Sequence, residues 1–232
     1  MRSLIVRFIN CEGPGIIEEI LRKENYSVTY HDTFKKHEKL VPNSHLFFDL
    51  LILMGGPYSL ADNSNKEFFH PYFELVENMI SIPSKKIIGV CLGGQLISKV
   101  LGGDVSKGEK GIETGFSKVQ IQDKSDFVFN GINQNSITAF HLHENVFTIP
   151  KSGKHLLSGG VYPNQMFSYE DRVFGIQCHL EPTMKMVKDW SVVHKDFIGK
   201  SSNAYPLLDE NMQKETEETG KIIFQNMIRK KK

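Results

Sequence analysis

The chain has 232 residues, of which 40% are hydrophobic, and this content is enough for one large α/β domain with a sizeable core. Its 28 basic and 27 acidic residues leave a formal net charge of +1. This balance, with no basic stripe interleaved with aromatic residues, argues against nucleic acid as a partner.

The first half of the chain alternates short apolar strands with amphipathic helices. Residues 4–9 predict the first strand, and apolar residues at helical spacing after Gly15 predict a helix that ends near Asn25. The further predicted elements are strands at residues 28–30, 48–54 and 87–90 and helices at residues 68–80 and 92–101. Strands that alternate with helices in this way predict a doubly wound, mostly parallel sheet flanked by helices.

Beyond Gly111 the apolar runs become shorter and more typical of strands. They predict strands, some of them antiparallel, at residues 119–121, 137–140, 166–169 and 173–178, the last of which returns to the main sheet. Two helices are expected at residues 182–197 and 211–228, followed by a frayed basic tail at residues 229–232. We therefore expect a single domain over residues 1–232.

A cysteine lies where one predicted strand turns into a helix. Cys91 follows the strand at residues 87–90, and Gly89 and Gly93 flank it where a β-carbon would crowd a sharp turn. This pattern is typical of a nucleophile elbow, with sulfur in place of oxygen. A buried structural cysteine is the alternative, because free cysteines often serve as small core residues.

The position of Cys91 favours nucleophilic chemistry. Free N–H groups and the helix dipole at a helix N-terminus favour the thiolate form of a cysteine. The backbone N–H of Leu92 would point toward an oxyanion that forms at the sulfur. Gly56, in the Gly55-Gly56-Pro57 turn after the strand at residues 48–54, is a candidate second donor if that strand neighbours the one before Cys91.

A second motif near the C-terminus supplies a candidate base. His179 and Glu181 are two residues apart at the end of a predicted strand, and residues at that spacing share a face of an extended chain. Pro182 disfavours a helical conformation at Glu181 and suits the first position of the following helix. His179 is therefore a candidate general base, and Glu181 is the candidate group that fixes its tautomer.

These motifs together resemble the class I, or triad, glutamine amidotransferase family. The resemblance rests on G-x-C-x-G-x-Q at residues 89–95, the strand-terminal Gly-Gly-Pro and H-x-E-P at residues 179–182. It covers nearly the whole chain and implies a flavodoxin-like fold. Segments 12–15, 111–115 and 164–167 resemble the stand-alone branch of GMP-synthase-like amidotransferases.

The resemblance also implies roles for individual residues. Cys91 attacks the side-chain amide of glutamine, the amides of Gly56 and Leu92 hold the oxyanion, and His179 with Glu181 transfers protons. The implied glutamine-binding residues are Gly55, Gln95 and His141. His141 belongs to the segment His141-Leu142-His143-Glu144, which resembles the family's glutamine-binding loop but departs from it at Leu142 and Glu144.

No metal or cofactor is expected from the sequence. His141 and His143 form a His-x-His pair that could bind a metal, but no third ligand stands at a fixed spacing from them. Phosphate-binding GxxxxGK, HExxH and paired CxxC motifs do not occur. The three cysteines are too few for a disulfide framework, and the short apolar run at residues 4–9 contains Arg7, so we expect a cytoplasmic protein without a membrane span.

Three hypotheses for function remain open. The first is hydrolysis of L-glutamine through a cysteinyl thioester, with ammonia passed to an unknown acceptor or to a synthase subunit. The second is a γ-glutamyl hydrolase or peptidase that uses the same Cys91, His179 and Glu181. The third is a non-catalytic domain that binds a ligand or a partner, and the intact triad argues against it. The oligomeric state is left open by the sequence.

Overall fold

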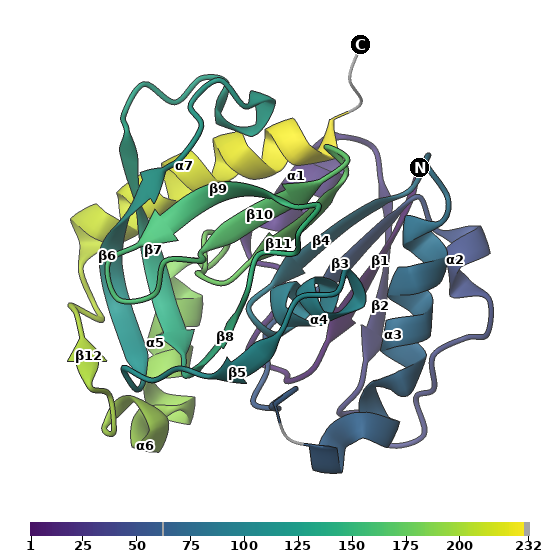
Figure 1. Cartoon of the computed structure of the whole chain (residues 1–232), viewed down its shortest axis with the longest axis horizontal. Helices are drawn as coiled ribbons and strands as arrows, with labels where there is room; N and C mark the ends of the chain where they lie inside the picture. Colours follow the sequence, from purple (N-terminus) through teal and green to yellow (C-terminus); the bar gives the residue numbers. More distant parts are fainter. Residues whose placement is uncertain (62, 230–232) are drawn as a thin grey trace.

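The computed structural model of the chain describes residues 1–61 and 63–229 (Figure 1). Residues 230–232 of the predicted basic tail lie outside the described residues. The centre of the described molecule is a large mixed sheet in the order β12-β6-β9-β10-β11-β4-β3-β1-β2, with β7 paired to β6. A separate two-stranded sheet is formed by β5 and β8.

The strands of the large sheet fall into a parallel and an antiparallel half. The parallel half consists of β1 (Arg2–Arg7), β2 (Ser27–Asp32), β3 (Leu50–Leu53), β4 (Lys86–Val90) and β11 (Val173–Ile176). The antiparallel half contains β6 (Glu113–Ile121), β7 (Ser136–His143), β9 (Lys154–Gly159) and β10 (Met166–Tyr169). The short strands are β5 (Val105–Lys107), β8 (Asn145–Phe147) and β12 (Asn203–Ala204). The predicted doubly wound, mostly parallel arrangement is confirmed, and the last long strand does return to the main sheet beside β4.

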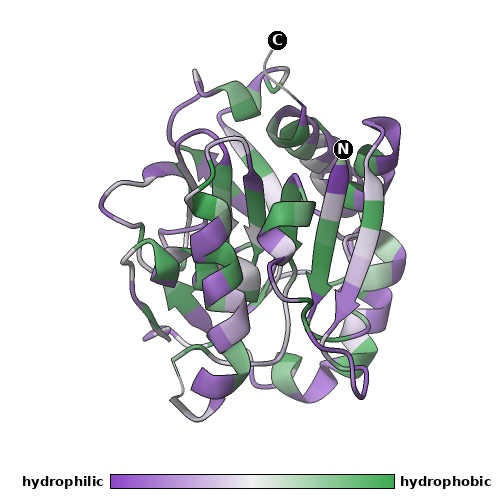
Figure 2. Cartoon of the chain, turned by 90° about the vertical axis from the view of Figure 1, so that its right-hand side faces the viewer, coloured by the Kyte–Doolittle hydropathy of each residue, from purple (hydrophilic) through white to green (hydrophobic). Residues whose placement is uncertain are grey.

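Helices cover both faces of the sheet (Figure 1). The α-helices are α1 (Ile16–Lys23), α2 (Ser44–Phe47), α3 (Lys66–Ile80), α4 (Leu92–Val100), α5 (Met184–Val193), α6 (Lys195–Ile198) and α7 (Glu210–Ile228), and the 3-10 helices are η1 (Asn63–Asn65) and η2 (Phe127–Phe129). Apolar residues of α1 and α7 pack with one face of the sheet, and those of α3 and α4 pack with the other. Alternate residues of β1 accordingly belong to different cores, as Ile5 and Leu4 do. Figure 2 shows hydrophobic residues concentrated along the strands and polar residues along the outer parts of the helices.

Two elements differ from the prediction. The helix expected at residues 182–197 is divided at His194, which has a non-helical backbone and separates α5 from α6. β6 begins at Glu113 rather than near residue 119, because Glu113 through Gln120 pair in register with β7. Backbone pairing between distant segments leaves little trace in an apolar pattern, so the prediction missed this part of the strand.

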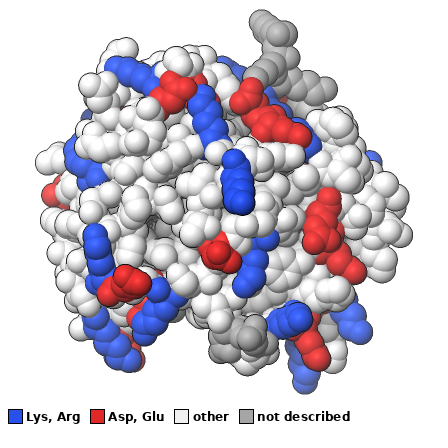
Figure 3. Space-filling view, in the orientation of Figure 1, with Lys and Arg blue, Asp and Glu red and all other residues white. Residues whose placement is uncertain are grey.

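The surface and the helices carry two further observations. On the face seen in Figure 3, acidic and basic side chains lie interspersed, and neither sign forms a large patch. No helix in the described part of the chain is both long and apolar enough to cross a membrane.

Candidate active site

The turn at Cys91 has a strained backbone. Cys91 joins β4 to α4 with φ of 51° and ψ of −108°, a conformation that residues other than glycine rarely adopt. Its N–H donates to the carbonyl oxygen of Ile176 at 2.7 Å, which ties the turn to the neighbouring strand β11. Such strain persists only where the surrounding structure holds it, and here both neighbouring elements do so.

The glycines around Cys91 are required by close packing. A β-carbon on Gly93 would lie 2.2 Å from the carbonyl oxygen of Leu53, and one on Gly89 would lie 2.4 Å from the backbone of Gly93. Both contacts are too short for real atoms, and their partners are backbone atoms that cannot turn aside. α4 therefore approaches β3 and β4 this closely only because both positions are glycine.

His179 and Glu181 form a buried pair immediately after β11. Nδ1 of His179 and Oε1 of Glu181 are 2.6 Å apart, and each side chain is 1% exposed. His179 also forms an isolated antiparallel bridge with Phe140 of β7, and its ring packs edge-on against Trp190. These contacts fix the imidazole from both halves of the sheet.

The charge state of His179 is set by its neighbours. Burial alone would lower the pKa of His179, but the Glu181 carboxylate and the Cys91 thiol outweigh burial and hold that pKa well above its usual value. Nε2 of His179 has no hydrogen-bond partner among the described residues and is free to act on a bound molecule. The geometry favours a protonated imidazole beside the cysteine.

Two backbone N–H groups near the sulfur have no acceptor within the described part of the chain. They belong to Gly56 and to Leu92, the first residue of α4. β3 and β4 pair in parallel, so the turn after β3 lies beside the elbow, as the sequence analysis required. A β-carbon on Gly56 would lie 2.6 Å from the β-carbon of Phe8, so this close approach needs glycine.

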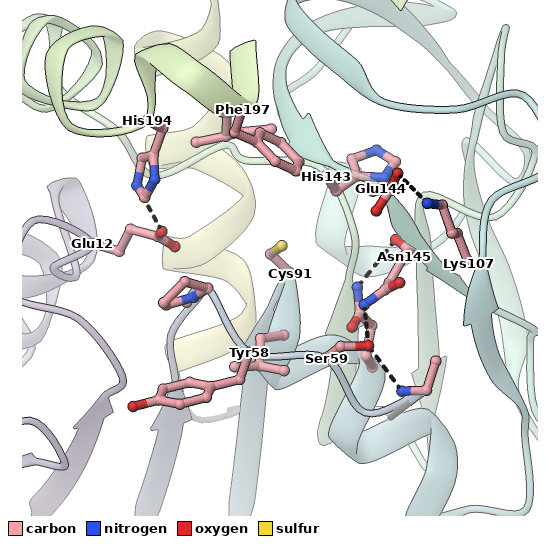
Figure 4. A pocket seen from close by; sticks show the side chains of 16 residues that line it. Glu12, Tyr58, Ser59, Cys91, Lys107, His143, Glu144, Asn145, His194 and Phe197 are labelled. Atoms are coloured by element: carbon pink, nitrogen blue, oxygen red, sulfur yellow. Dashed lines mark hydrogen bonds and ion pairs between the residues drawn. The ribbon is translucent and has the colours of Figure 1, made fainter. Parts of the chain in front are cut away.

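A cavity of about 510 Å³ opens above Cys91 (Figure 4). Its wall includes the two candidate oxyanion donors and charged side chains of both signs. The lining residues used below are Glu12, Gly56, Cys91, Leu92, Gln95, Lys107, His143, Glu144, Asn145 and His194. Pockets of this size are typical of small-molecule sites.

Comparisons with known proteins agree with this geometry. Residues 15–198 match the model of the glutamine amidotransferase class-I family, which is most of the chain. The chain belongs to the class-I glutamine amidotransferase family.

Individual relatives of this amidotransferase support the same assignment. The chain is 35% identical over 153 residues to the glutamine-hydrolyzing subunit of a GMP synthase from Sulfolobus acidocaldarius, covering 65% of this chain and 76% of the relative. It is 28% identical over 187 residues to a glutamine amidotransferase-like protein, chry6, of Gibberella zeae, covering 78% and 72%. The crystal structure of a glutamine amidotransferase from Thermotoga maritima superposes with a TM-score of 0.84 at 28% identity, over 98% of this chain and 96% of that one. The flavodoxin-like amidotransferase fold expected from the motifs is confirmed.

The amidotransferase places the predicted glutamine-binding residues unevenly. Gln95 lines the cavity, and its side-chain amide donates to the carbonyl oxygen of Asn145 and to Oε1 of Gln177, each at 3.2 Å. Gly55 and His141 do not line it. His141 is fully buried behind the wall, where its Nε2 lies 3.0 Å from Oγ of Ser117, and His143 is the histidine of this segment that reaches the cavity.

A cluster of Cys11, Glu12 and His194 beside the cavity was not predicted. Nε2 of His194 lies 3.2 Å from Oε1 of Glu12 and 3.7 Å from the sulfur of Cys11. These two partners raise the pKa of His194 to about 9 despite its burial. A signal was present, because Glu12 follows β1 and loops after parallel strands converge on sites of this kind.

The remaining predicted core residue behaves as expected. Cys178 lies between Gln177 and His179, has no exposed surface and belongs to the core shared with α1 and α7. Burial raises the pKa of its thiol, so it stays protonated and unreactive.

Proposed function

We propose that this protein hydrolyses the side-chain amide of L-glutamine, with Cys91 as the nucleophile, His179 as the acid and base, and Glu181 as the group that orients His179. The observation that carries the proposal is the strained Cys91 on the cavity floor beside the buried His179–Glu181 pair. Strain at a cavity-facing residue is costly and is retained where function needs it. A non-catalytic binding domain would need neither the strain nor the raised pKa of His179.

The first half of the proposed reaction breaks the amide bond. The thiolate of Cys91 attacks the side-chain carbonyl carbon of glutamine, and the N–H groups of Gly56 and Leu92 hold the resulting oxyanion. The imidazolium of His179 then gives its Nε2 proton to the amide nitrogen. The carbon–nitrogen bond breaks, ammonia leaves, and a γ-glutamyl thioester remains on Cys91.

The second half regenerates the enzyme. Neutral His179 takes a proton from water, and the hydroxide formed adds to the thioester carbonyl while the same N–H groups hold the oxyanion. Collapse expels the Cys91 thiolate and releases glutamate. His179 returns to its protonated state, which the Glu181 carboxylate stabilises throughout.

Two cavity side chains fit the zwitterionic end of an amino-acid substrate. Nζ of Lys107 lies 3.0 Å from Oε1 of Glu144, and both residues line the cavity. An amino acid carries an α-carboxylate that needs a cation and an α-ammonium that needs an acceptor. We assign these contacts to Lys107 and Glu144, which would exchange part of their mutual pairing for the substrate.

The ammonia released is proposed to pass to a separate synthase subunit. The Sulfolobus relative is itself one subunit of a GMP synthase, which supports an arrangement of this kind. The acceptor is not identified by this argument. A synthase subunit that raises glutamine turnover when mixed with this protein would support it.

The size of the cavity favours a second candidate, a γ-glutamyl hydrolase that uses the same triad. A cavity of about 510 Å³ can hold a molecule larger than glutamine, whose side chain ends at the amide nitrogen. In that reaction the leaving group would be a larger amine instead of ammonia. The chemistry at Cys91 would be unchanged.

One assay separates these candidates. Glutamate release would be measured from glutamine and from a panel of γ-glutamyl amides, with and without an added synthase subunit, and with Cys91→Ala as the matched control. Release from glutamine that disappears in Cys91→Ala supports the proposal. Rapid release from larger amides with glutamine ignored would favour the hydrolase, and equal release by the wild type and Cys91→Ala would contradict both.

A further inference from the structure

Three buried side chains behind the cavity wall converge from two strands. Glu113 of β6 stands directly opposite His143 of β7, and Gly115 stands opposite His141. Residues two apart on a strand share a face, so all three side chains project from the same side of this strand pair. Because Gly115 has no side chain, the space beside His141 stays open to Glu113.

The donor atoms of this cluster are close together. Oε2 of Glu113 lies 3.2 Å from Nε2 of His143 and 3.5 Å from Nδ1 of His141. One ligand atom from each residue lies within 4.8 Å of those of the other two. Neighbouring ligand atoms around a tetrahedral Zn²⁺ ion are roughly 3.3 Å apart, as bond lengths of about 2.0–2.1 Å require.

Polar atoms of this cluster are buried without hydrogen bonds. Both carboxylate oxygens of Glu113, Nδ1 of His141 and both ring nitrogens of His143 have no hydrogen-bond partner among the described residues. Glu113 and His141 are 0% exposed, and His143 is 3% exposed. Buried polar groups are nearly always satisfied, so five such atoms facing one another need an explanation.

We propose that Glu113, His141 and His143 bind one divalent transition-metal ion of the Zn²⁺ type. Two imidazole nitrogens and one carboxylate oxygen are ligands that such ions prefer. Oγ of Ser117 lies 3.0 Å from Nε2 of His141 and fixes its tautomer, so that Nδ1 presents its lone pair to the ion. His143, which lines the cavity, marks the route by which the ion enters.

The site would clamp the cavity wall rather than perform the proposed hydrolysis. β7 ends at His143, and the next residues, Glu144 and Asn145, line the cavity. An ion bridging β6 and β7 at this point would hold that wall in place. The sequence analysis expected no metal because Glu113 lies on a different strand, where no fixed spacing from the His-x-His pair reveals it.

Metal titration of purified full-length protein tests the proposal. Chelator-treated protein would be titrated with Zn²⁺ and with Co²⁺ in the wild type and in Cys91→Ser, which removes the thiolate that could compete for the ion. We expect one ion per chain in both, with a Kd of about 1 µM or below. The Co²⁺ form should show visible d–d absorption without a thiolate charge-transfer band.

Variants assign the ion to these residues. Glu113→Gln and His143→Gln should lose binding, while Ser117→Ala should weaken it about 10–100-fold by releasing His141. His70→Gln, an exposed histidine on α3, is the matched control and should bind as the wild type does. Ser117→Ala keeps the test decisive if the other two variants fail to fold.

Stability provides a readout independent of catalysis. Zn²⁺ at 100 times its Kd should raise the melting temperature by about 5–10 °C in the wild type and leave Glu113→Gln unchanged. Absence of a stoichiometric ion, or unchanged binding in Glu113→Gln, His143→Gln and Ser117→Ala, would overturn the proposal. In that case the three side chains would form a proton-sharing network without a metal.

Discussion

The parallel strands β3, β4 and β11 and the antiparallel pair β6 and β7 meet at one cavity but build it by different means. In the parallel half, backbone geometry dominates, since Cys91 sits in a strained turn held by glycines that admit no β-carbon. In the antiparallel half, side chains dominate, since Glu113, His141 and His143 converge across a strand pair. The comparison separates a half that positions the reacting atoms from a half that shapes and braces the wall.

The largest effect should come from the pair that follows β11. In Glu181→Gln, His179 loses the carboxylate that raises its pKa, so burial lowers that pKa and the imidazolium is lost at lower pH. We expect kcat to fall about 10³–10⁴-fold and the high-pH limb of the rate profile to move to lower pH. Glu67→Gln on the exposed side of α3 is the control. Turnover within tenfold of the wild type would remove Glu181 from the account.

A smaller loss should follow from disturbing the turn after β3. In Gly56→Ala the new methyl group would meet Phe8, so the turn must shift and move its N–H away from the oxyanion. Losing one such donor typically lowers kcat about 10²–10³-fold. Gly13→Ala, whose β-carbon meets nothing within 4 Å, should leave kcat unchanged. If both variants behave alike in steady-state kinetics, the Gly56 N–H has no special role.

The antiparallel half should affect binding more than chemistry. Glu144→Gln removes the acceptor assigned to the α-ammonium of the substrate, so KM for glutamine should rise about tenfold with kcat nearly unchanged. Glu109→Gln, an exposed neighbour outside the cavity, should change neither constant. A fall in kcat with constant KM in Glu144→Gln would place this wall in the chemistry and weaken the comparison.

The smallest effect concerns His194, which touches the loop after β1 from the end of α5. Its folded pKa of about 9 lies above the ordinary value of 6.5, so its contribution to stability is complete below about pH 6.5 and is lost as the pH rises to about 9. Urea unfolding across this range should show the wild type losing more stability than His194→Gln. A difference between the two proteins that does not change with pH would show that His194 is not protonated in the fold.

The elbow could be predicted because its signals are local. Cys91, Gly89 and Gly93 lie within one short stretch, and the turn they make follows from their own backbone preferences. His179 and Glu181 were found for the same reason, since a spacing of two on a strand fixes a shared face. Their assignment as catalytic residues remains a prediction until it is tested.

The other half of the site could not be predicted from spacing. Glu113 meets His143 only through the register of β6 and β7, and the apolar pattern of the sequence does not encode that register. The prediction chose His141 as the cavity residue, whereas the strand end brings His143 there. His194 escaped notice because the break between α5 and α6 carries no glycine or proline.

The most direct test of the central claim is the mass of the protein during turnover. Protein mixed with glutamine, quenched in acid and digested should carry one γ-glutamyl group on the peptide that contains Cys91, and the adduct should accumulate in His179→Gln if the base for its hydrolysis is lost. Cys91→Ser should show no thioester. Wild-type glutamate release with no adduct on Cys91 under single-turnover conditions, together with full activity in Cys91→Ala, would contradict the account.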